Sequence, residues 1–490
     1  MARVIPILIS AALYALGDCT QDAATSYYRS TTVVKTTSGL LIGHPGPNRS
    51  VVAEFLGVPY AAPPIGELRF APPVRLPSSN ATLNASEWVP KGAAQASGFP
   101  RFHPQAQQII DYFVGGAGTP QSEDCLTLNI WTKPTASAAQ QKKPVLIFLH
   151  GGRFANGNTH TPFYDGQALA DAEDVVVVTL NYRLNIFGFP GAPDAAGNLG
   201  LRDQRLAVEW IRDNIAGFGV TPPAWCSSDN QLAAWLWITG RTLTKRIRSR
   251  QIINWHNASH ALGCGADENS LACMRTKSWV EILKAASQVQ SAASDNPVRS
   301  TPPFYPQADE KLVFSDYGKR SRDGNFARLP YVLGNNDNEQ GYYVISAYGR
   351  GVNVTKSQGD DFLLTSFTCP NHAQALSRRA AGVPVWQYRY FGDWESTRLY
   401  PTSGAYHGVD MHMIFGNSEA VTVLPPSEEQ EQTVAFMRHL WVQFAADPVN
   451  SLSRAGWSRF EPGSESLARF AHGNSPRWSF VEPETLAADC

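Results

Sequence analysis

The chain has 490 residues, with 41 basic and 42 acidic side chains and a formal net charge of -1 at pH 7. That balance gives no electrostatic reason to expect a nucleic acid or an acidic membrane surface as partner. The content of 39 glycines, 34 prolines and 43% hydrophobic residues is typical of a loop-rich globular protein and excludes an intrinsically disordered one.

The N-terminus has the pattern of a cleaved secretory signal peptide. Arg3 precedes an apolar run that ends near Leu16, and small residues follow. The run is too short to cross a bilayer, and no other segment qualifies as a transmembrane helix. We expect residues 1–17 to be removed and residues 18–490 to form one secreted, extracellular domain.

Short apolar runs and amphipathic stretches then alternate along the chain. Residues 31–60 predict an antiparallel hairpin region at a sheet edge. Further strands are predicted at 126–131, 144–150, 175–182, 328–336 and 383–391. Two of these runs, 144–150 and 175–182, are continuously apolar, which indicates strands covered on both faces. Helices are predicted from 200 to Gly217 and over 428–448, so the fold class is α/β.

Residues 220 to 250 do not continue this alternation of strand and helix patterns. Three tryptophans (Trp225, Trp235 and Trp237) precede a basic cluster, and neither the strand period nor the helix period fits. A nucleic-acid patch is disfavoured by the neutral charge of the chain. A solvated basic loop is a better interpretation of these residues, and a displaced reading frame is better still.

Seven cysteines leave one unpaired in an oxidising compartment. Cys264 and Cys273 lie nine residues apart, and we expect them to close a small disulfide loop. Four others could form two more bridges, with a connectivity that the sequence does not determine: Cys19, Cys125, Cys369 and Cys490. The odd residue is then Cys226, within the irregular segment.

Five N-x-S/T sequons are in keeping with a secreted glycoprotein. They lie at Asn48, Asn80, Asn84, Asn257 and Asn353. For metals and nucleotides there is no corresponding pattern, because C-x-x-C, H-E-x-x-H and Walker-type motifs are all missing from the sequence. We therefore expect neither a metal nor a cofactor.

Several blocks resemble the type-B carboxylesterase and lipase family, which includes cholinesterase-like enzymes and secreted fungal esterases. The blocks occur in the family's order and cover nearly the whole mature chain except about 220–252. They are "FLGVPYAAPPIGELRFAPP" (55–73), "SEDCLTLNIW" (122–131), "HGGRFANG" (150–157), "LNYRLNIFGF" (180–189), "GNLGLRDQRLAVEWI" (197–211), "GNNDNEQGYY" (334–343), "GAYHGVDMHMIFG" (404–416) and "FAADP" (444–448). The resemblance implies an α/β-hydrolase fold, with a mostly parallel central sheet between two layers of helices.

The same resemblance implies a Ser-Glu-His triad for ester hydrolysis. It assigns Glu339 as the acid and His407 as the base, since the imidazole moves the serine proton while the carboxylate fixes its tautomer. Backbone N–H groups of Gly151 and Gly152 match the oxyanion hole. Arg153 stands where a third glycine is frequent, so its side chain must point away from the hole.

A further pair, Arg69 and Glu123, matches a structural ion pair of the family. Its role would be to hold the scaffold, not to take part in catalysis.

The nucleophile is the missing part. Such enzymes carry their serine in G-x-S-x-G, a strand-to-helix turn that does not occur anywhere in this sequence. Ser227 and Ser228 lack flanking glycines, so the strained turn that exposes the hydroxyl cannot form around them.

A reading frame displaced by one base would explain the irregular segment. Trp225 followed by Cys226 then gives the codon for valine, and the junction from Asn230 to Gln231 allows serine. With free third bases chosen to suit, Gly-Gln-Ser-Ala-Gly is readable after a strand. The resemblance also suggests that about thirty residues are absent after Arg250. We therefore interpret 220–252 as mistranslated or truncated, with the elbow strand and helix disrupted.

Two hypotheses follow for the function. The first is a secreted serine carboxylesterase or lipase whose chain as written lacks its nucleophile and is inactive. The second is a non-catalytic binding or adhesion protein of the cholinesterase-like kind. A pseudoenzyme would be expected to keep a well-patterned elbow with the serine replaced, which favours the first hypothesis. Acyl and alcohol preference are not readable from the sequence.

Overall fold

The computed structural model of the chain describes residues 32–92, 104–113, 120–134, 143–220, 246–291, 296–299, 301–422 and 424–490. The expected signal peptide (1–17), Cys19, Cys226 and most of the irregular segment 220–252 lie outside these residues. Within the described ranges, no helix combines the length and apolarity needed to cross a membrane.

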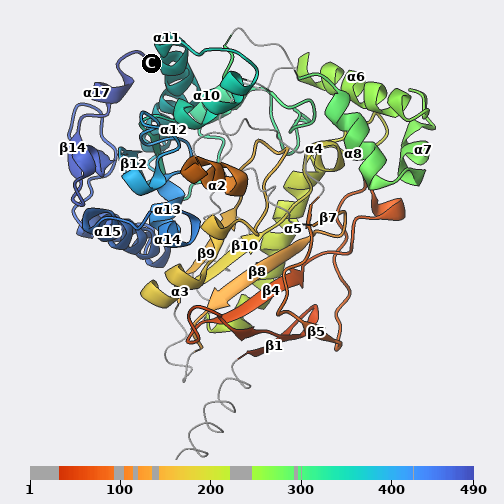
Figure 1. The fold of residues 1–490 in the computed structure, drawn as a ribbon, viewed down its shortest axis with the longest axis horizontal. Helices are drawn as coiled ribbons and strands as arrows, with labels where there is room; N and C mark the ends of the chain where they lie inside the picture. Colours follow the sequence, from red (N-terminus) through yellow and green to blue (C-terminus); the bar gives the residue numbers. More distant parts are fainter. Residues whose placement is uncertain are drawn as a thin grey trace, which may run out of the picture.

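The expected hairpin region at the beginning of the chain is confirmed. Strand β1 (Val33–Thr36) pairs antiparallel with β2 (Gly39–Ile42), and β5 (Thr82–Asn84) adds a third strand (Figure 1). Gly39, at the turn, has a φ of +136°, and a Cβ there would lie 2.4 Å from the carbonyl oxygen of Ala81. Only glycine fits this close approach of two backbones.

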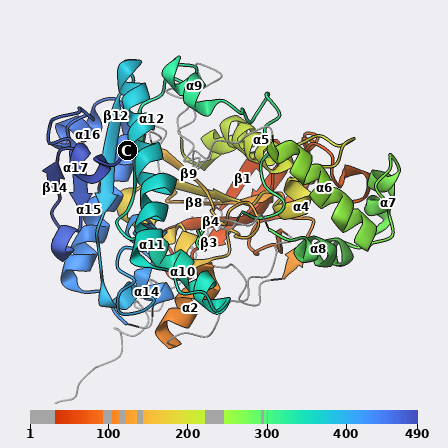
Figure 2. The same cartoon turned by 90° about the horizontal axis from the view of Figure 1, so that it is seen from above.

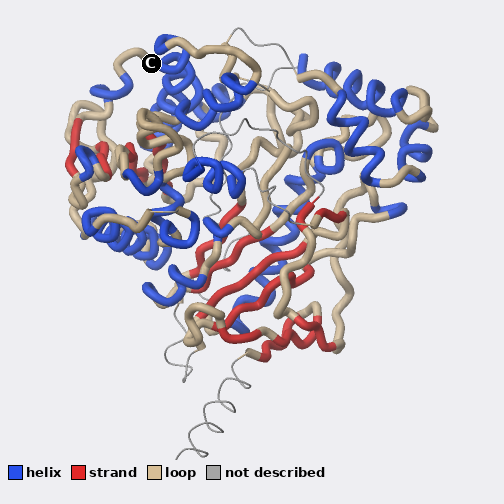
Figure 3. The backbone as a smooth tube through the Cα atoms, in the orientation of Figure 1, coloured by secondary structure: helices blue, strands red, loops and turns tan. Residues whose placement is uncertain are grey.

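A five-stranded sheet forms the centre of the N-terminal half, in the order β3-β4-β8-β10-β9. Its strands are β3 (His44–Pro45), β4 (Ala53–Pro59), β8 (Thr127–Thr132), β10 (Val176–Leu180) and β9 (Val145–Leu149). Figure 3 shows these strands running diagonally through the lower half of the molecule. Strands β8, β9 and β10 occur where the apolar runs predicted them.

Both faces of this sheet are covered, as the continuous apolar runs require. Along β10, Val176 and Val178 pack into one core cluster with Ile211 and Trp210 of helix α5 (Leu199–Asn214). Val177 points into the opposite cluster, which contains residues of α15 (Glu428–Ala446). The period of two along the strand thus divides its side chains between two hydrophobic layers.

The C-terminal half contains a second sheet in the order β11-β12-β13-β14. Its strands are β11 (Tyr331–Asn336), β12 (Val385–Tyr390), β13 (Leu467–Phe470) and β14 (Ser479–Val481). The first three run parallel and the last antiparallel.

The expectation of a single, mostly parallel sheet needs correction for the described strands. They form separate sheets, and in the five-stranded one only β9 and β10 pair parallel. The β3–β4, β4–β8 and β8–β10 pairs are antiparallel. Strand–helix alternation predicted parallel pairs, but the connection from β4 to β8, which includes helix α2 (Pro104–Phe113), joins the two strands as antiparallel neighbours. The elbow strand expected between the halves falls in 221–245, outside the described residues.

Helices enclose the sheets from both sides (Figure 2). Helix α5 ends at Asn214 and continues as a 3₁₀ turn, Ile215–Phe218, close to the predicted end at Gly217. Three helices form a group beside the five-stranded sheet: α6 (Arg246–Ala261), α7 (Ser270–Thr276) and α8 (Trp279–Gln288). Near β11 and β12 lie α10 (Gln340–Gly349), α11 (Lys356–Leu363), a π-helical turn (Leu364–Thr368) and α12 (Cys369–Ala380).

The remaining short elements complete the layers. They are α2 (Pro104–Phe113), α3 (Gln167–Glu173), α4 (Asn185–Gly188), α9 (Tyr317–Arg322), α13 (Asp410–Phe415), α14 (Ser418–Val421), α16 (Ser451–Arg454), α17 (Glu484–Ala487), β6 (Lys91–Gly92) and β7 (Gln121–Ser122).

Two disulfides are formed among the described cysteines. Cys264 pairs with Cys273 as expected, and Cys369 pairs with Cys490, which ties the C-terminus to the start of α12. The expectation that Cys125 takes part in a further bridge is wrong: its thiol is free and buried at the start of β8. A bridge requires Cα atoms within about 7 Å, and the other described cysteines are already paired with each other.

Removing the Cys264–Cys273 disulfide by serine substitution at both positions should cost about 2–3 kcal/mol of unfolding free energy. A loop of this length loses that much closure entropy in the unfolded chain. Chemical denaturation of the double variant and the parent measures the difference, and equal midpoints would contradict the prediction.

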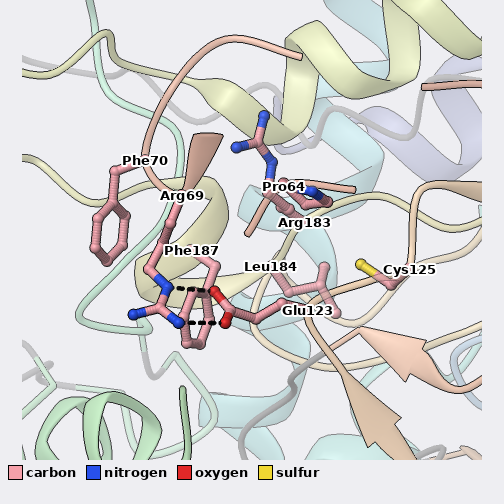
Figure 4. A pocket seen from close by; sticks show the side chains of 8 residues that line it. All are labelled: Pro64, Arg69, Phe70, Glu123, Cys125, Arg183, Leu184 and Phe187. Atoms are coloured by element: carbon pink, nitrogen blue, oxygen red, sulfur yellow. Dashed lines mark hydrogen bonds and ion pairs between the residues drawn. The ribbon is translucent and has the colours of Figure 1, made fainter. Parts of the chain in front are cut away.

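The predicted scaffold pair Arg69–Glu123 is buried and bidentate. Arg69 Nε donates to Glu123 Oε1 at 2.6 Å and Nη2 donates to Oε2 at 2.5 Å (Figure 4). Arg69 also donates to the backbone carbonyl of Lys277, which ties the loop after β4 to the end of α7. A second buried pair, Arg183 and Asp203, was not predicted. Its Nη2–Oδ1 distance is 2.7 Å.

Candidate active site

Glu339 lies directly after the end of β11, at the N-terminus of α10. Its side chain is fully buried. One carboxylate oxygen, Oε1, accepts a hydrogen bond of 2.7 Å from the backbone N–H of Asn336. The carboxylate is therefore fixed by the strand end that precedes it.

His407 meets the other oxygen of this carboxylate. Its Nδ1 lies 2.6 Å from Glu339 Oε2, so the two predicted partners are in hydrogen-bond contact although 68 residues separate them. The two loops are bound together by backbone pairing, because Asn338 N donates to the carbonyl of Ala405 at 3.0 Å. The His407 side chain remains 26% exposed.

Aromatic side chains surround the imidazole of His407. The ring centroid of Tyr343, on α10, lies 5.1 Å from it, and that of Phe367, on the π-helical turn, lies 5.6 Å from it. Phe362 packs against both Tyr343 and Phe367. The His407 ring is thus held between a carboxylate on one side and aromatic rings on the other.

The glycines expected to form an oxyanion hole follow β9 in a tight turn. Gly152 has a φ of +114°, and a Cβ there would lie 2.1 Å from the carbonyl oxygen of Asn156. Gly151 is exposed and meets no such restriction. The conformation of this turn therefore depends on glycine at 152.

His150 anchors the same turn from inside the protein. Its ring stacks on Tyr182 with centroids 4.6 Å apart, and its carbonyl accepts a hydrogen bond of 2.7 Å from the Tyr182 hydroxyl. Burial lowers the pKa of His150 to about 4, so this imidazole is neutral near pH 7. Its part is structural, because it is enclosed by the fold.

Arg153 follows the two glycines, and its side chain packs against Tyr343. It has a φ of 55°, and its guanidinium carbon lies 4.8 Å from the ring centroid of Tyr343. Nη2 donates to the carbonyl of Val298 at 3.4 Å. Because Tyr343 also contacts His407, one aromatic ring joins the glycine turn to the imidazole.

A second buried carboxylate, Asp410, was missed in the sequence. Asn336 Nδ2 donates to Asp410 Oδ1 at 3.0 Å, and the Tyr388 hydroxyl donates to Oδ2 at 3.3 Å. Burial, with the nearby Glu339 charge, raises the pKa of Asp410 to about 6. Its position three residues after His407 is the signal that could have found it.

Other predicted features of the site are only partly placed by the structure. Ser227, Ser228 and the expected elbow lie outside the described residues. The described residues hold no cluster of metal-binding side chains. All five sequon asparagines are described and exposed.

Comparison with known proteins decides the family. Residues 30–224 match the Carboxylesterase family. Secreted lipase 5 of Gibberella zeae is 30% identical over 546 residues, covering 100% of this chain and 98% of that protein. The chain belongs to the carboxylesterase family. It is thus a hydrolase of the carboxylesterase and lipase type, as the sequence blocks predicted.

Other members of the carboxylesterase family are similar over most of their length. The chlorogenic acid esterase of Aspergillus niger is 28% identical, over 90% of each chain. The para-nitrobenzyl esterase of Bacillus subtilis is 27% identical, over 85% of this chain and 90% of that protein. Both names describe ester-cleaving enzymes, which agrees with an ester as the substrate class.

His412, near the site in this carboxylesterase, should make the fold sensitive to acid. It is fully buried against Phe163, both ring nitrogens are without a hydrogen-bond partner, and burial lowers its pKa to about 3. The unfolded chain takes up this proton near pH 6.5. The free energy of unfolding is therefore unaffected by protonation of His412 above about pH 6.5. It decreases as the pH drops from 6.5 toward 3, by about 2 kcal/mol at pH 5.

The substitution His412→Leu tests this acid sensitivity. Between pH 7.5 and pH 5 the variant should lose about 2 kcal/mol less unfolding free energy than the parent, because leucine takes up no proton. Urea denaturation at the two pH values gives the comparison. If the variant and the parent lost the same unfolding free energy between pH 7.5 and pH 5, His412 would not be the group responsible.

Proposed function

We propose that the gene encodes a secreted serine carboxylic ester hydrolase. Glu339 and His407 would supply the acid and base of its triad, and the backbone N–H groups of Gly151 and Gly152 would bind the oxyanion. The observation that carries the proposal is the 2.6 Å contact between His407 Nδ1 and Glu339 Oε2. A carboxylate held against the inner nitrogen of an imidazole fixes the tautomer that leaves the outer nitrogen to accept a proton.

The mechanism would follow from this orientation. His407 would take the proton of the attacking serine, and that serine would add to the ester carbonyl. The negative charge on the carbonyl oxygen would be stabilised by the N–H groups of the glycine turn, which is already shaped by Gly152. His407 would then give its proton to the leaving alcohol.

The chain as written has no serine in a nucleophile elbow, and we propose that residues 220–252 are displaced in frame and truncated. The retained contact between Glu339 and His407 supports a site that evolved for catalysis. Secretion, signal cleavage after residue 17 and glycosylation at the five exposed sequons belong to the same proposal. They are supported by the two disulfides and by relatives named as secreted lipases.

A rebuilt chain tests the function. It carries Gly-Gln-Ser-Ala-Gly in the shifted frame and the segment absent after residue 250. We expect it to hydrolyse 4-nitrophenyl acetate at an enzyme-like rate, while the written chain stays near the uncatalysed rate because its sequence has no Gly-x-Ser-x-Gly serine to act as the nucleophile. Alanine in place of the restored serine should abolish turnover.

The alternative function is a non-catalytic binding or adhesion protein, favoured only by the missing motif. It would be supported if transcript sequencing across codons 218–256 confirmed the written frame and the folded written chain were secreted. An inactive but well-folded rebuilt chain would contradict the esterase proposal.

A further inference from the structure

Asn336 is bonded to both partners of the contact between Glu339 and His407. It is the last residue of β11, and its side chain is buried. Its backbone N–H donates to Glu339 Oε1 at 2.7 Å. Its side-chain amide, Nδ2, donates to the carbonyl of Tyr406 at 2.7 Å and to Asp410 Oδ1 at 3.0 Å. One residue thus binds the acid and the segment that carries the base.

The two side-chain bonds reach both sides of His407. The Tyr406 carbonyl belongs to the residue directly before it, and the Asp410 carboxylate lies three residues after it. Another tie between the two loops, from Asn338 N to the carbonyl of Ala405, lies before His407. The amide therefore holds the segment on both sides of the imidazole, at the strand end that also fixes the acid.

The orientation of this amide is set by its partners. The Tyr406 carbonyl and the Asp410 carboxylate both accept hydrogen bonds, so only the NH2 end of the amide can face them. The opposite atom, Asn336 Oδ1, is buried and has no hydrogen-bond partner among the described residues. Such a buried, unsatisfied atom costs about 1–3 kcal/mol. A leucine of similar size would avoid that cost, so packing alone does not explain the amide.

Two buried carboxylates meet at Asn336. Glu339 and Asp410 are both buried, and burial together with the Glu339 charge raises the pKa of Asp410 to about 6. Like charges in a buried site repel each other. The backbone N–H of Asn336 faces one carboxylate and its side-chain N–H faces the other, so the same residue stabilises both charges.

We propose that Asn336 is a positioning residue for ester hydrolysis, which holds the Glu339 carboxylate against His407 Nδ1 by bonding to the loops that carry them. The inference rests on the proposed function and adds a residue to it. Asn336 would act through the contact between acid and base, and not on the ester itself. Without the amide, carboxylate and imidazole can move apart, and the imidazole is no longer held in the tautomer that accepts the serine proton.

The substitution Asn336→Leu in the rebuilt chain tests this role. It removes the amide but keeps the size of the side chain and the backbone N–H. We expect kcat for 4-nitrophenyl acetate to fall about a hundredfold with KM unchanged, the loss that a displacement of about 1 Å can cause. In a Glu339→Gln background the same substitution should hardly lower kcat further, because no carboxylate is left to position. An unchanged kcat, or the same loss in both backgrounds, would overturn the proposal.

The matched control is Asn335→Leu. Asn335 precedes Asn336 on β11 and is also buried, but its Oδ1 accepts a hydrogen bond of 3.3 Å from Asn371 Nδ2 of α12. Neighbouring residues of a strand point to opposite faces of the sheet, so this control replaces a buried amide away from His407. Asn335→Leu should keep kcat. Equal losses of kcat in the two variants would assign the effect to the fold.

A second variant covers the case in which Asn336→Leu does not fold, as judged by thermal denaturation. Asn336→Ser carries the same prediction, because its single hydroxyl can donate to one of the two acceptors at most. A folded Asn336→Ser variant with parental kcat would overturn the proposal.

Labelling of the full chain as written gives a readout that does not depend on a nucleophile. Diethyl pyrocarbonate acylates an imidazole only in its unprotonated form. The pH dependence of labelling at His407, located by peptide mass spectrometry, therefore reports how strongly Glu339 favours the protonated form. The pH of half-maximal rate should fall by about half a unit in Asn336→Leu, toward the value in Glu339→Gln. It should stay in place in Asn335→Leu. Identical profiles in Asn336→Leu and the parent would contradict the proposal.

The two measurements separate this inference from the proposed function. If the rebuilt chain cleaves no ester but the labelling of His407 depends on Asn336, the esterase proposal fails and the positioning of His407 by Asn336 stands. If the rebuilt chain cleaves 4-nitrophenyl acetate while neither kcat nor the labelling profile responds to Asn336→Leu, the esterase proposal stands and the role of Asn336 is wrong.

Discussion

Replacing His407 by alanine in the rebuilt chain should lower kcat for 4-nitrophenyl acetate by about a million-fold. A triad acts as a unit, so loss of its base removes nearly all the catalysis that the nucleophile provides. Replacing Glu339 by glutamine should cost about ten-thousand-fold, because the amide can no longer hold the imidazole in the required tautomer. Both rates are measured by release of 4-nitrophenol under saturating substrate.

A second histidine–glutamate pair serves as the control for this prediction. His439 Nδ1 lies 3.0 Å from Glu173 Oε2, but its side chain is 56% exposed and lies on α15. His439→Ala should leave kcat unchanged. If His407→Ala kept more than about a hundredth of the parental kcat, His407 would not be the general base.

Breaking the buried ion pair Arg69–Glu123 should be among the most destabilising single changes in the protein. Glu123→Ala leaves the Arg69 guanidinium buried without its carboxylate, and both side chains are less than a tenth exposed. Such a loss costs about 3–5 kcal/mol. Arg69 also joins the loop after β4 to α7, so the effect should appear as a lower denaturation midpoint of the whole molecule.

The exposed pair formed by Lys319, on α9, and Asp323, just after the end of α9, provides the matched comparison. Its side chains are 66% and 41% exposed, and such surface pairs contribute less than about 1 kcal/mol. Asp323→Asn should therefore hardly move the midpoint. Equal effects of Glu123→Ala and Asp323→Asn would show that the buried pair does not stabilise the fold.

The sequence predicted the elements whose patterns are local. β8, β9, β10 and α15 were found because continuous apolar runs and amphipathic periods are properties of neighbouring residues. The contact between Glu339 and His407 was also anticipated, but from the order of the family blocks. No period or propensity connects two loops 68 residues apart.

Long-range pairings were not readable in the same way. The partner of Cys369 depends on where the chain end returns, and Cys490 reaches it only after 121 residues. Asp410 was missed because a carboxylate near a histidine is unremarkable until Asn336 and Tyr388 are seen to enclose it. The antiparallel pairing of β4 with β8 and of β8 with β10 was missed because strand direction depends on the connections, not on the strands themselves.

Labelling of the protein produced from the native gene tests the central claim most directly. A fluorophosphonate probe reacts with a serine only when a base such as His407 activates it. After digestion and mass spectrometry, we expect one labelled serine, within Gly-Gln-Ser-Ala-Gly, in a peptide that replaces the written residues 220–252. Recovery of the peptides as written, including Trp225 and Cys226, with no labelled serine would contradict the account.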